Sequence, residues 1–168
     1  MQKPNRTDIP VYFAPFFDLA KGTDIYQMLK VDIEDAVKFF QAISEEKSEY
    51  RYEEGKWTPK EIICHLTSAE VYFCSLMIKL TNDQNSGPTA YALGKYDMGA
   101  HVNKPYHEVL NHLVKARTAT IQLLKSYDEE LLNKLQIFKG NNYTPLALSY
   151  VIIGHTLHHC NIIKERYL

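Results

Sequence analysis

Hydrophobic positions recur at helical spacing in four segments of the chain. From residue 24 onward, apolar side chains return every three or four positions, which predicts a first helix over about 24–45. The same spacing predicts further helices over about 59–82, 105–127 and 145–168. Each segment is roughly 20 residues long and strand signals are almost absent, so the pattern predicts an all-α four-helix bundle.

Two of these helices begin with the same start signal. Thr58 can cap the second helix, Pro59 suits its first position, and Glu61 completes a capping box. Thr144 and Pro145 repeat the threonine-proline pair before the fourth helix. The beginnings of the second and fourth helices are therefore well defined by the sequence.

Two segments lack helical spacing. Residues 1–22 place three prolines among aromatic side chains, which predicts an extended N-terminal strap packed across the bundle. Residues 82–105 are long for a structureless connection, which indicates a crossover between distant helix ends or a lid over a site. Tyr91 and Tyr96 in this connection could line such a site. The length of 168 residues suits one core, so 1–168 is predicted to be a single domain.

Charge and composition narrow the possible partners. The chain has 19 basic and 20 acidic residues, so it lacks the excess of basic side chains that nucleic acids or anionic membranes attract. Its three cysteines cannot close a complete set of intrachain disulfides. No signal-peptide pattern opens the chain, and its longest apolar stretches fall short of a bilayer span. We expect a cytoplasmic protein that binds neither nucleic acid nor membrane.

Three histidines lie close together in the fourth helix. Residues four apart on a helix are separated by about 40°, so His155 and His159 stack on one face, while His158 lies about 60° from His155. The same face carries an apolar stripe made of Leu148, Val151, Ile152, Ile162 and Ile163. The two rings should therefore point toward the interior, either as ordinary buried histidines or as ligands of a metal ion.

A third imidazole could come from the second helix. His65 follows Thr58 by seven residues and His155 follows Thr144 by eleven, so the two can reach one level near a bundle end. Three neutral imidazoles with an open fourth position form a site at which zinc, nickel, copper or iron can do chemistry. Thr156 occupies the place of the general base in an HExxH zinc protease, which argues against proteolysis.

Two stretches of the chain resemble a known family. The segments YRYEEGKWTPKEIICHLTSAEV and YTPLALSYVIIGHTLHHCNIIKERYL resemble the paired signatures of the DinB/YfiT-like superfamily of metal-dependent helical bundles. The resemblance implies a four-helix bundle with a long crossover between helices 2 and 3, usually a homodimer. It also implies that His65, His155 and His159 bind a divalent metal, most readily zinc or nickel, with His158 as a neighbour.

The resemblance further implies an enzyme acting on a small molecule. Several similar proteins transfer or isomerise groups with a low-molecular-weight thiol such as bacillithiol or mycothiol, and a divalent ion favours the reactive thiolate. The first expectation is therefore a metal-dependent S-transferase or isomerase. A metal-dependent hydrolase is one alternative, because the same ion activates water. A non-catalytic metal-binding or ligand-binding stress-response bundle is another.

Three further residues have two interpretations each. Trp57 precedes the helix cap and serves either as a hydrophobic staple or as part of a pocket wall. Glu61 lies one turn before His65 and acts either as a base or only as a cap. Arg117 stands among apolar neighbours in the third helix and either holds an anionic substrate or pairs with a carboxylate.

Overall fold

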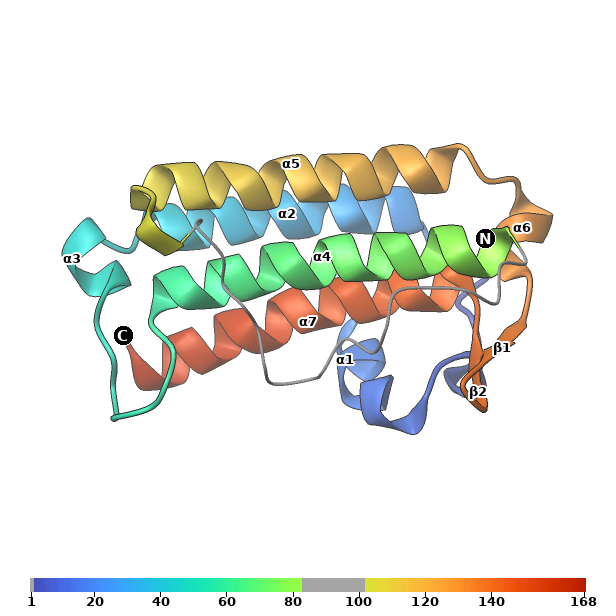
Figure 1. The fold of residues 1–168 in the computed structure, drawn as a ribbon, viewed down its shortest axis with the longest axis horizontal. Coiled ribbons are helices and arrows are strands. Elements are labelled where there is room, and N and C mark those ends of the chain that lie inside the picture. The colour runs from blue at the N-terminus through green and yellow to red at the C-terminus, as the bar shows by residue number, and fades with distance from the viewer. Residues whose placement is uncertain (1, 83–101) are drawn as a thin grey trace.

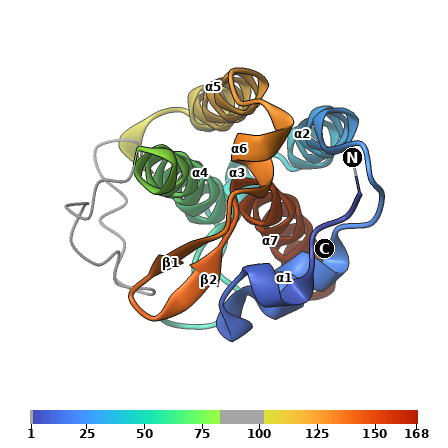
Figure 2. The ribbon, with the colours of Figure 1, turned by 90° about the vertical axis from the view of Figure 1, so that its right-hand side faces the viewer.

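Four long helices form a bundle in the computed structural model, which describes residues 2–82 and 102–168. The bundle consists of α2 (Ile25–Gln41), α4 (Pro59–Thr81), α5 (Tyr106–Lys125) and α7 (Pro145–Arg166) (Figure 1). Seen from one end, the four helices surround a common core (Figure 2). Their bounds lie within a few residues of those predicted, and the predicted four-helix bundle is confirmed. The predicted connection, with Tyr91 and Tyr96, falls largely on residues 83–101, outside the described part of the chain.

The start signals work as the sequence indicates. The Thr58 hydroxyl accepts a hydrogen bond from the backbone N–H of Glu61, and the Glu61 carboxylate accepts one from the N–H of Thr58, which completes the capping box of α4. The Thr144 hydroxyl accepts a hydrogen bond from the N–H of Ala147 at the start of α7. Both helices also carry proline in their first turn.

Short elements fill the connections. The described residues include two short helices, α3 (Glu45–Ser48) and α6 (Glu129–Asn133), and a hairpin of β1 (Gln136–Phe138) and β2 (Asn141–Tyr143). The hairpin was not expected from the sequence, because strands of three residues are too short to display alternation. Its turn uses positive φ angles of 50° at Lys139 and 75° at Gly140, as tight hairpins require.

The N-terminal strap corrects one expectation. Instead of an extended chain, the structure has two 3-10 turns, η1 (Arg6–Asp8) and η2 (Val11–Phe13), followed by the helix α1 (Ala14–Leu19). Pro15 lies in the first turn of α1, where proline is tolerated in a helix. The expected packing is present, since α1 lies against α7 (Figure 2). At the crossing, a Cβ atom on Gly154 would lie 1.7 Å from the carbonyl oxygen of Phe16.

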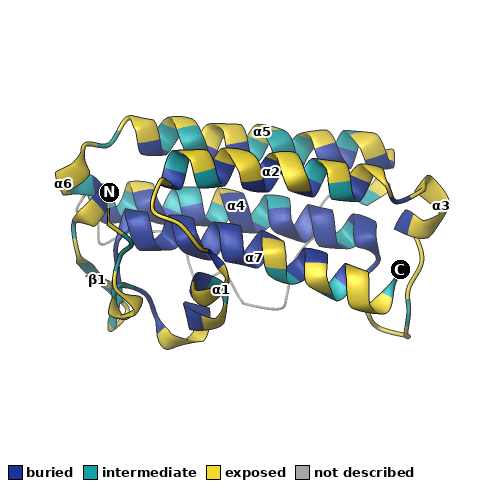
Figure 3. Ribbon diagram, turned by 180° about the vertical axis from the view of Figure 1, so that it is seen from behind, coloured by how far each residue is buried: buried dark blue, intermediate teal, exposed yellow. Residues whose placement is uncertain are grey.

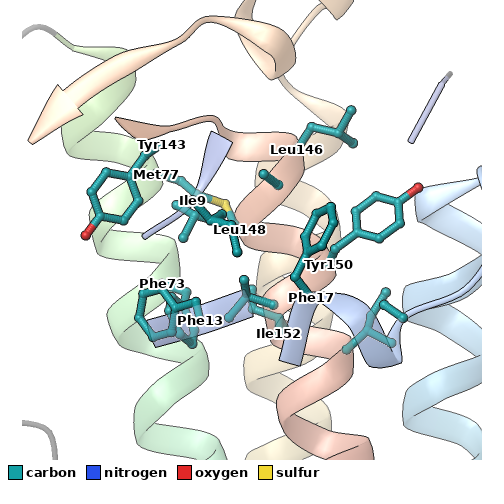
Figure 4. Packing of buried hydrophobic residues seen from close by; sticks show 14 of the residues in the cluster. Ile9, Phe13, Phe17, Phe73, Met77, Tyr143, Leu146, Leu148, Tyr150 and Ile152 are labelled. Atoms are coloured by element: carbon teal, nitrogen blue, oxygen red, sulfur yellow. The ribbon is translucent and has the colours of Figure 1, made fainter. Parts of the chain in front are cut away.

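The buried hydrophobic residues form two clusters that succeed one another along the bundle. The first surrounds the N-terminal half of α7 and takes in Phe13 and Phe17 of the strap (Figure 4). The second joins α2, α4 and α5 to the C-terminal half of α7. Burial along α7 is continuous over its first part and gives way to exposed positions near its end (Figure 3). His155 and His159 therefore lie where the two clusters meet.

Two of the described helices correct the expectation that no apolar stretch could span a bilayer. By length and composition, α4 and α7 qualify, with mean hydropathies of 1.3 and 1.2 over their most apolar windows. However, 56% of that window in α4 and 78% in α7 is buried inside the bundle. Packing in the core accounts for their apolar composition, because a helix surrounded by protein is hydrophobic on most sides.

Candidate metal centre

The three predicted histidines converge in the bundle interior. His65 comes from α4, and His155 and His159 come from α7, which runs antiparallel to α4 (Figure 1). The Nε2 atom of His155 lies 3.0 Å from Nε2 of His65 and 3.1 Å from Nε2 of His159. All three side chains are buried, and one nitrogen from each lies within 4.8 Å of the others. Among the described residues, this is the one cluster of histidine, cysteine or acidic side chains with metal-binding geometry.

The donor set suits a divalent transition metal. Two ligand nitrogens at about 2.0–2.1 Å from a tetrahedral zinc ion would be about 3.3 Å apart, close to the separations of 3.0 and 3.1 Å between His155 and its two neighbours. Hydrogen bonding alone leaves the cluster underused, because the single Nε2 of His155 can make only one strong bond to its two neighbours. A cation bound at the centre would accept the lone pairs of all three rings. These residues therefore fit such an ion. A metal-bound histidine usually donates its other ring N–H to a neighbouring group, but Nδ1 of His159 makes no hydrogen bond to a described residue.

Burial keeps the three imidazoles neutral. It lowers the pKa of His65 to about 4, that of His155 to about 3 and that of His159 to about 2, and mutual repulsion between the rings adds to the shift of the last two. Neutral imidazole is the form that binds a metal ion. The cluster is thus in its ligand form throughout the physiological pH range.

These shifts predict acid sensitivity of the metal-free protein. The folded pKa values lie below the unfolded value of 6.5, so the unfolded state takes up more protons and stability falls as pH drops below that value. Between pH 7 and pH 6 we expect a loss of about 0.7 kcal/mol for each histidine, or about 2 kcal/mol in all. Urea unfolding of chelator-treated protein at the two pH values measures it. Equal losses in wild type and in a His155→Gln, His159→Gln variant would contradict the expectation.

Comparison with known proteins places the chain in a family. Residues 28–163 match the family model of the DinB superfamily. The chain belongs to the DinB superfamily. A comparison with curated protein sequences gave no significant match.

Solved structures share the fold of this DinB protein at low sequence identity. YfiT from Bacillus subtilis, described as a probable metal-dependent hydrolase with an unusual four-helix bundle topology, is 14% identical with a TM-score of 0.69, over 84% of this chain and 82% of YfiT. An uncharacterised protein from Clostridium difficile 630 is 14% identical with a TM-score of 0.68, over 86% of this chain and 96% of that protein. A protein from Streptococcus pneumoniae is 14% identical with a TM-score of 0.58, over 90% of this chain and 96% of that protein. At this identity the likeness establishes the fold.

Aromatic rings enclose the histidines of this DinB bundle on two sides. The Trp57 ring lies 4.7 Å from that of His65 and 6.4 Å from that of His159, measured between centroids. The Phe16 ring, from the strap, lies 5.0 Å from that of His155 and 5.2 Å from that of His158. His158 is half-buried beside His159 and outside the cluster, and burial lowers its pKa. Trp57 was expected as a staple or a pocket wall, whereas the contact of Phe16 was not expected, because only the fold brings the strap there.

A pocket of about 380 Å³ opens beside His159. It is lined by Tyr52, Gly55, Lys56, Trp57, Ile62, His159, Ile162 and Tyr167. Trp57 therefore forms part of a pocket wall, one of the two roles expected for it. A larger cavity of about 620 Å³ lies between α2 and α7, but its lining contains none of the three histidines. The larger of these two cavities therefore does not lie at the candidate metal centre. The arrangement of the three histidine nitrogens identifies the site more specifically than cavity volume does.

Glu61 is committed to structure. Its two carboxylate oxygens each accept a hydrogen bond of 2.6 Å from Arg51, in addition to the capping contact with Thr58. Burial by itself would raise its pKa, but these hydrogen bonds lower it below the usual value. The carboxylate therefore stays ionised and paired, so the cap interpretation fits better than that of a catalytic base.

Arg117 lies in the bundle core and is completely buried. Its Nη1 donates to the Asp32 carboxylate at 2.6 Å and its Nε donates to the Glu70 carboxylate at 2.7 Å. Its Nη2 donates to the hydroxyl of Thr156 at 3.1 Å. The pairing interpretation therefore holds. The sequence did not reveal Asp32 and Glu70 as partners, because the three residues come from three different helices.

The cysteines are not part of the candidate centre. Burial raises the pKa of Cys64 to about 11 and that of Cys160 to about 12, so both thiols stay protonated. Neither belongs to the histidine cluster, although each is next to one of its members in sequence. Neighbouring residues on a helix point about 100° apart, which separates these thiols from the histidine cluster.

Proposed function

We propose that this DinB protein is a divalent-metal-dependent enzyme that uses a low-molecular-weight thiol to transfer or isomerise a small substrate. His65, His155 and His159 would hold the ion, with zinc or nickel as the first candidates. The observation that carries the proposal is the convergence of three buried, neutral imidazoles with a pocket directly beside one of them. When bound, the ion would favour the thiolate over the thiol, whose ordinary pKa is about 8.5.

The surrounding residues would supply orientation and a dry site. Trp57 and Phe16 cover the histidines from two sides and limit the access of water. The pocket next to His159 gives a small molecule room to approach the open position. As far as the described residues go, the pocket lining contains no carboxylate that could serve as a base. This favours attack by a nucleophile that is already ionised.

Hydrolysis is the second candidate, because YfiT is described as a probable metal-dependent hydrolase. The same three histidines suit an ion that lowers the pKa of bound water to about 7. A non-catalytic bundle in which metal only joins two helices is the third possibility. Turnover separates the three: a transferase needs thiol, a hydrolase needs only water, and a structural site raises the melting temperature without turnover.

Metal analysis tests the basis of the proposal. Untagged protein, purified without chelating resin, should contain about one equivalent of divalent metal by plasma mass spectrometry. We expect a His155→Ala, His159→Ala variant to contain less than a tenth of that amount, because a single imidazole remains. His107→Ala removes an exposed histidine of α5 and serves as the matched control. A wild-type protein that stays metal-free after incubation with zinc or nickel would refute the proposal.

The assembly implied by the family resemblance is also a proposal. We expect a homodimer and a small-molecule substrate, and sedimentation equilibrium of the purified protein would test the first of these. The cytoplasmic location likewise stays a prediction.

A further inference from the structure

We infer that the pocket beside His159 binds an aromatic or flat apolar group of the substrate, and that the substrate is neutral or anionic, not cationic. The inference rests on the proposed metal-dependent function, and it names the substrate class for that site. Three of the eight lining residues are tyrosine or tryptophan, namely Tyr52, Trp57 and Tyr167. A volume of about 380 Å³ is near the lower end of the range of about 300–1,000 Å³ for ligand pockets, which suits one small ring system.

The aromatic wall is held in place by bonds at both of its ends. Arg51 pairs with both oxygens of Glu61 at 2.6 Å and also donates to the carbonyl oxygen of Lys56, so the loop before α4 is tied to the helix. The Tyr167 hydroxyl donates to the carbonyl oxygen of Trp57, which ties the end of α7 to the same loop. A wall fixed in this way loses little conformational entropy when it binds a ring.

The rings are also arranged for stacking. Tyr52 and Tyr167 meet edge to face, with 5.0 Å between centroids and an interplanar angle of 88°. Trp57 adds a further ring to the pocket lining and also contacts both His65 and His159. An aromatic substrate group would enter a setting of rings already spaced as aromatic pairs prefer.

The charge of the pocket lining indicates which charge the substrate can carry. Lys56 is the one charged residue in the pocket lining as the structure describes it. Glu61, which precedes the lining residue Ile62, is already paired with Arg51 and with the backbone of Thr58. An anionic substituent in the pocket therefore meets Lys56, whereas a cationic one is repelled by Lys56 and meets no carboxylate in the described lining.

A pair of hydroxamates tests the inference. Acetohydroxamate and benzohydroxamate share one metal-binding head, and only the second carries a ring. Binding to zinc-loaded protein can be followed by calorimetry and by the fluorescence of Trp57, the one tryptophan of the chain, which lies in the pocket wall. We expect benzohydroxamate to bind at least tenfold more tightly. A 4-carboxy derivative should bind more tightly than a 4-trimethylammonium derivative.

Variants of the wall sharpen the test. Tyr52→Ala should remove most of the benzohydroxamate advantage and leave acetohydroxamate affinity within twofold, because only the ring uses this wall. Ile162→Trp should fill the pocket and weaken benzohydroxamate at least tenfold. Tyr50→Ala is the matched control, since Tyr50 packs against Tyr167 with 6.4 Å between ring centroids but does not line the pocket.

The outcomes separate this inference from the proposed function. Equal affinities of the two hydroxamates for zinc-loaded protein would overturn the inference and leave metal binding intact. A protein that binds neither zinc nor nickel would refute the proposed function, and titration of the metal-free protein would then decide the inference. If the metal-free protein binds benzohydroxamate but not acetohydroxamate, and Tyr52→Ala weakens that binding, the result would support the aromatic pocket. Equal behaviour of the two hydroxamates would overturn the inference.

Discussion

Replacing Arg117 with methionine is expected to destabilise the protein by about 3–5 kcal/mol, the usual cost of removing one partner from a buried ion pair. The guanidinium touches Asp32 and Glu70, whose carboxylates are almost completely buried. Methionine fills a similar volume, so the loss would come from the two carboxylates left without their cation. Urea unfolding at pH 8 measures it. Arg166→Met removes an exposed arginine from the last turn of α7 and should change stability by less than about 1 kcal/mol.

The cost of Arg117→Met should fall in mild acid. Burial, opposed in part by Arg117, already raises the pKa of Asp32 to about 6 in the wild type. Without the cation, the pKa of Asp32 should rise further above that of the unfolded chain, so the folded variant binds protons more tightly. Its stability deficit relative to wild type should therefore shrink between pH 8 and pH 5.5. A deficit below 1 kcal/mol at pH 8, or one that grows in acid, would contradict this account.

Gly154→Ala is expected to cost about 3 kcal/mol, at the upper end of ordinary overpacking effects. The added Cβ would lie 1.7 Å from the carbonyl oxygen of Phe16, which is backbone and cannot rotate away as a side chain does. In an unobstructed helix the same change would stabilise the protein by about 1 kcal/mol. A loss of stability in Gly154→Ala would therefore indicate the close contact with Phe16. Asn161→Ala, at an exposed position of the same helix, is the matched control and should fall within about 0.5 kcal/mol.

The strap should detach before the bundle unfolds in Gly154→Ala. To make room, α1 must move away from α7, which would separate Phe16 from His155 and expose residues 2–22 to protease. Limited proteolysis with mass spectrometry would detect early cleavage in this segment, compared with wild type and with Asn161→Ala. Unchanged cleavage together with unchanged stability would mean that α1 does not press on Gly154 in solution.

The helices and two of the three histidines of the candidate centre follow from local sequence. Apolar spacing and the threonine-proline starts predicted the four long helices to within a few residues, because helical periodicity and capping depend on neighbours in the chain. His155 and His159 could be paired in the same way, since residues four apart share a helix face. The short hairpin and the turns of the strap escaped prediction, because their three-residue elements carry too little periodic signal.

The rest depends on tertiary structure. Whether His65 meets the other two histidines depends on the direction and register of α4 against α7, which no local pattern specifies. The same holds for Arg117, whose partners lie 85 and 47 residues away in sequence and were chosen by helix packing. The sequence by itself thus determined the family, the helices and the histidine pair on one face. Only the packed bundle decided which side chains meet, because contacts between distant segments depend on how whole helices align.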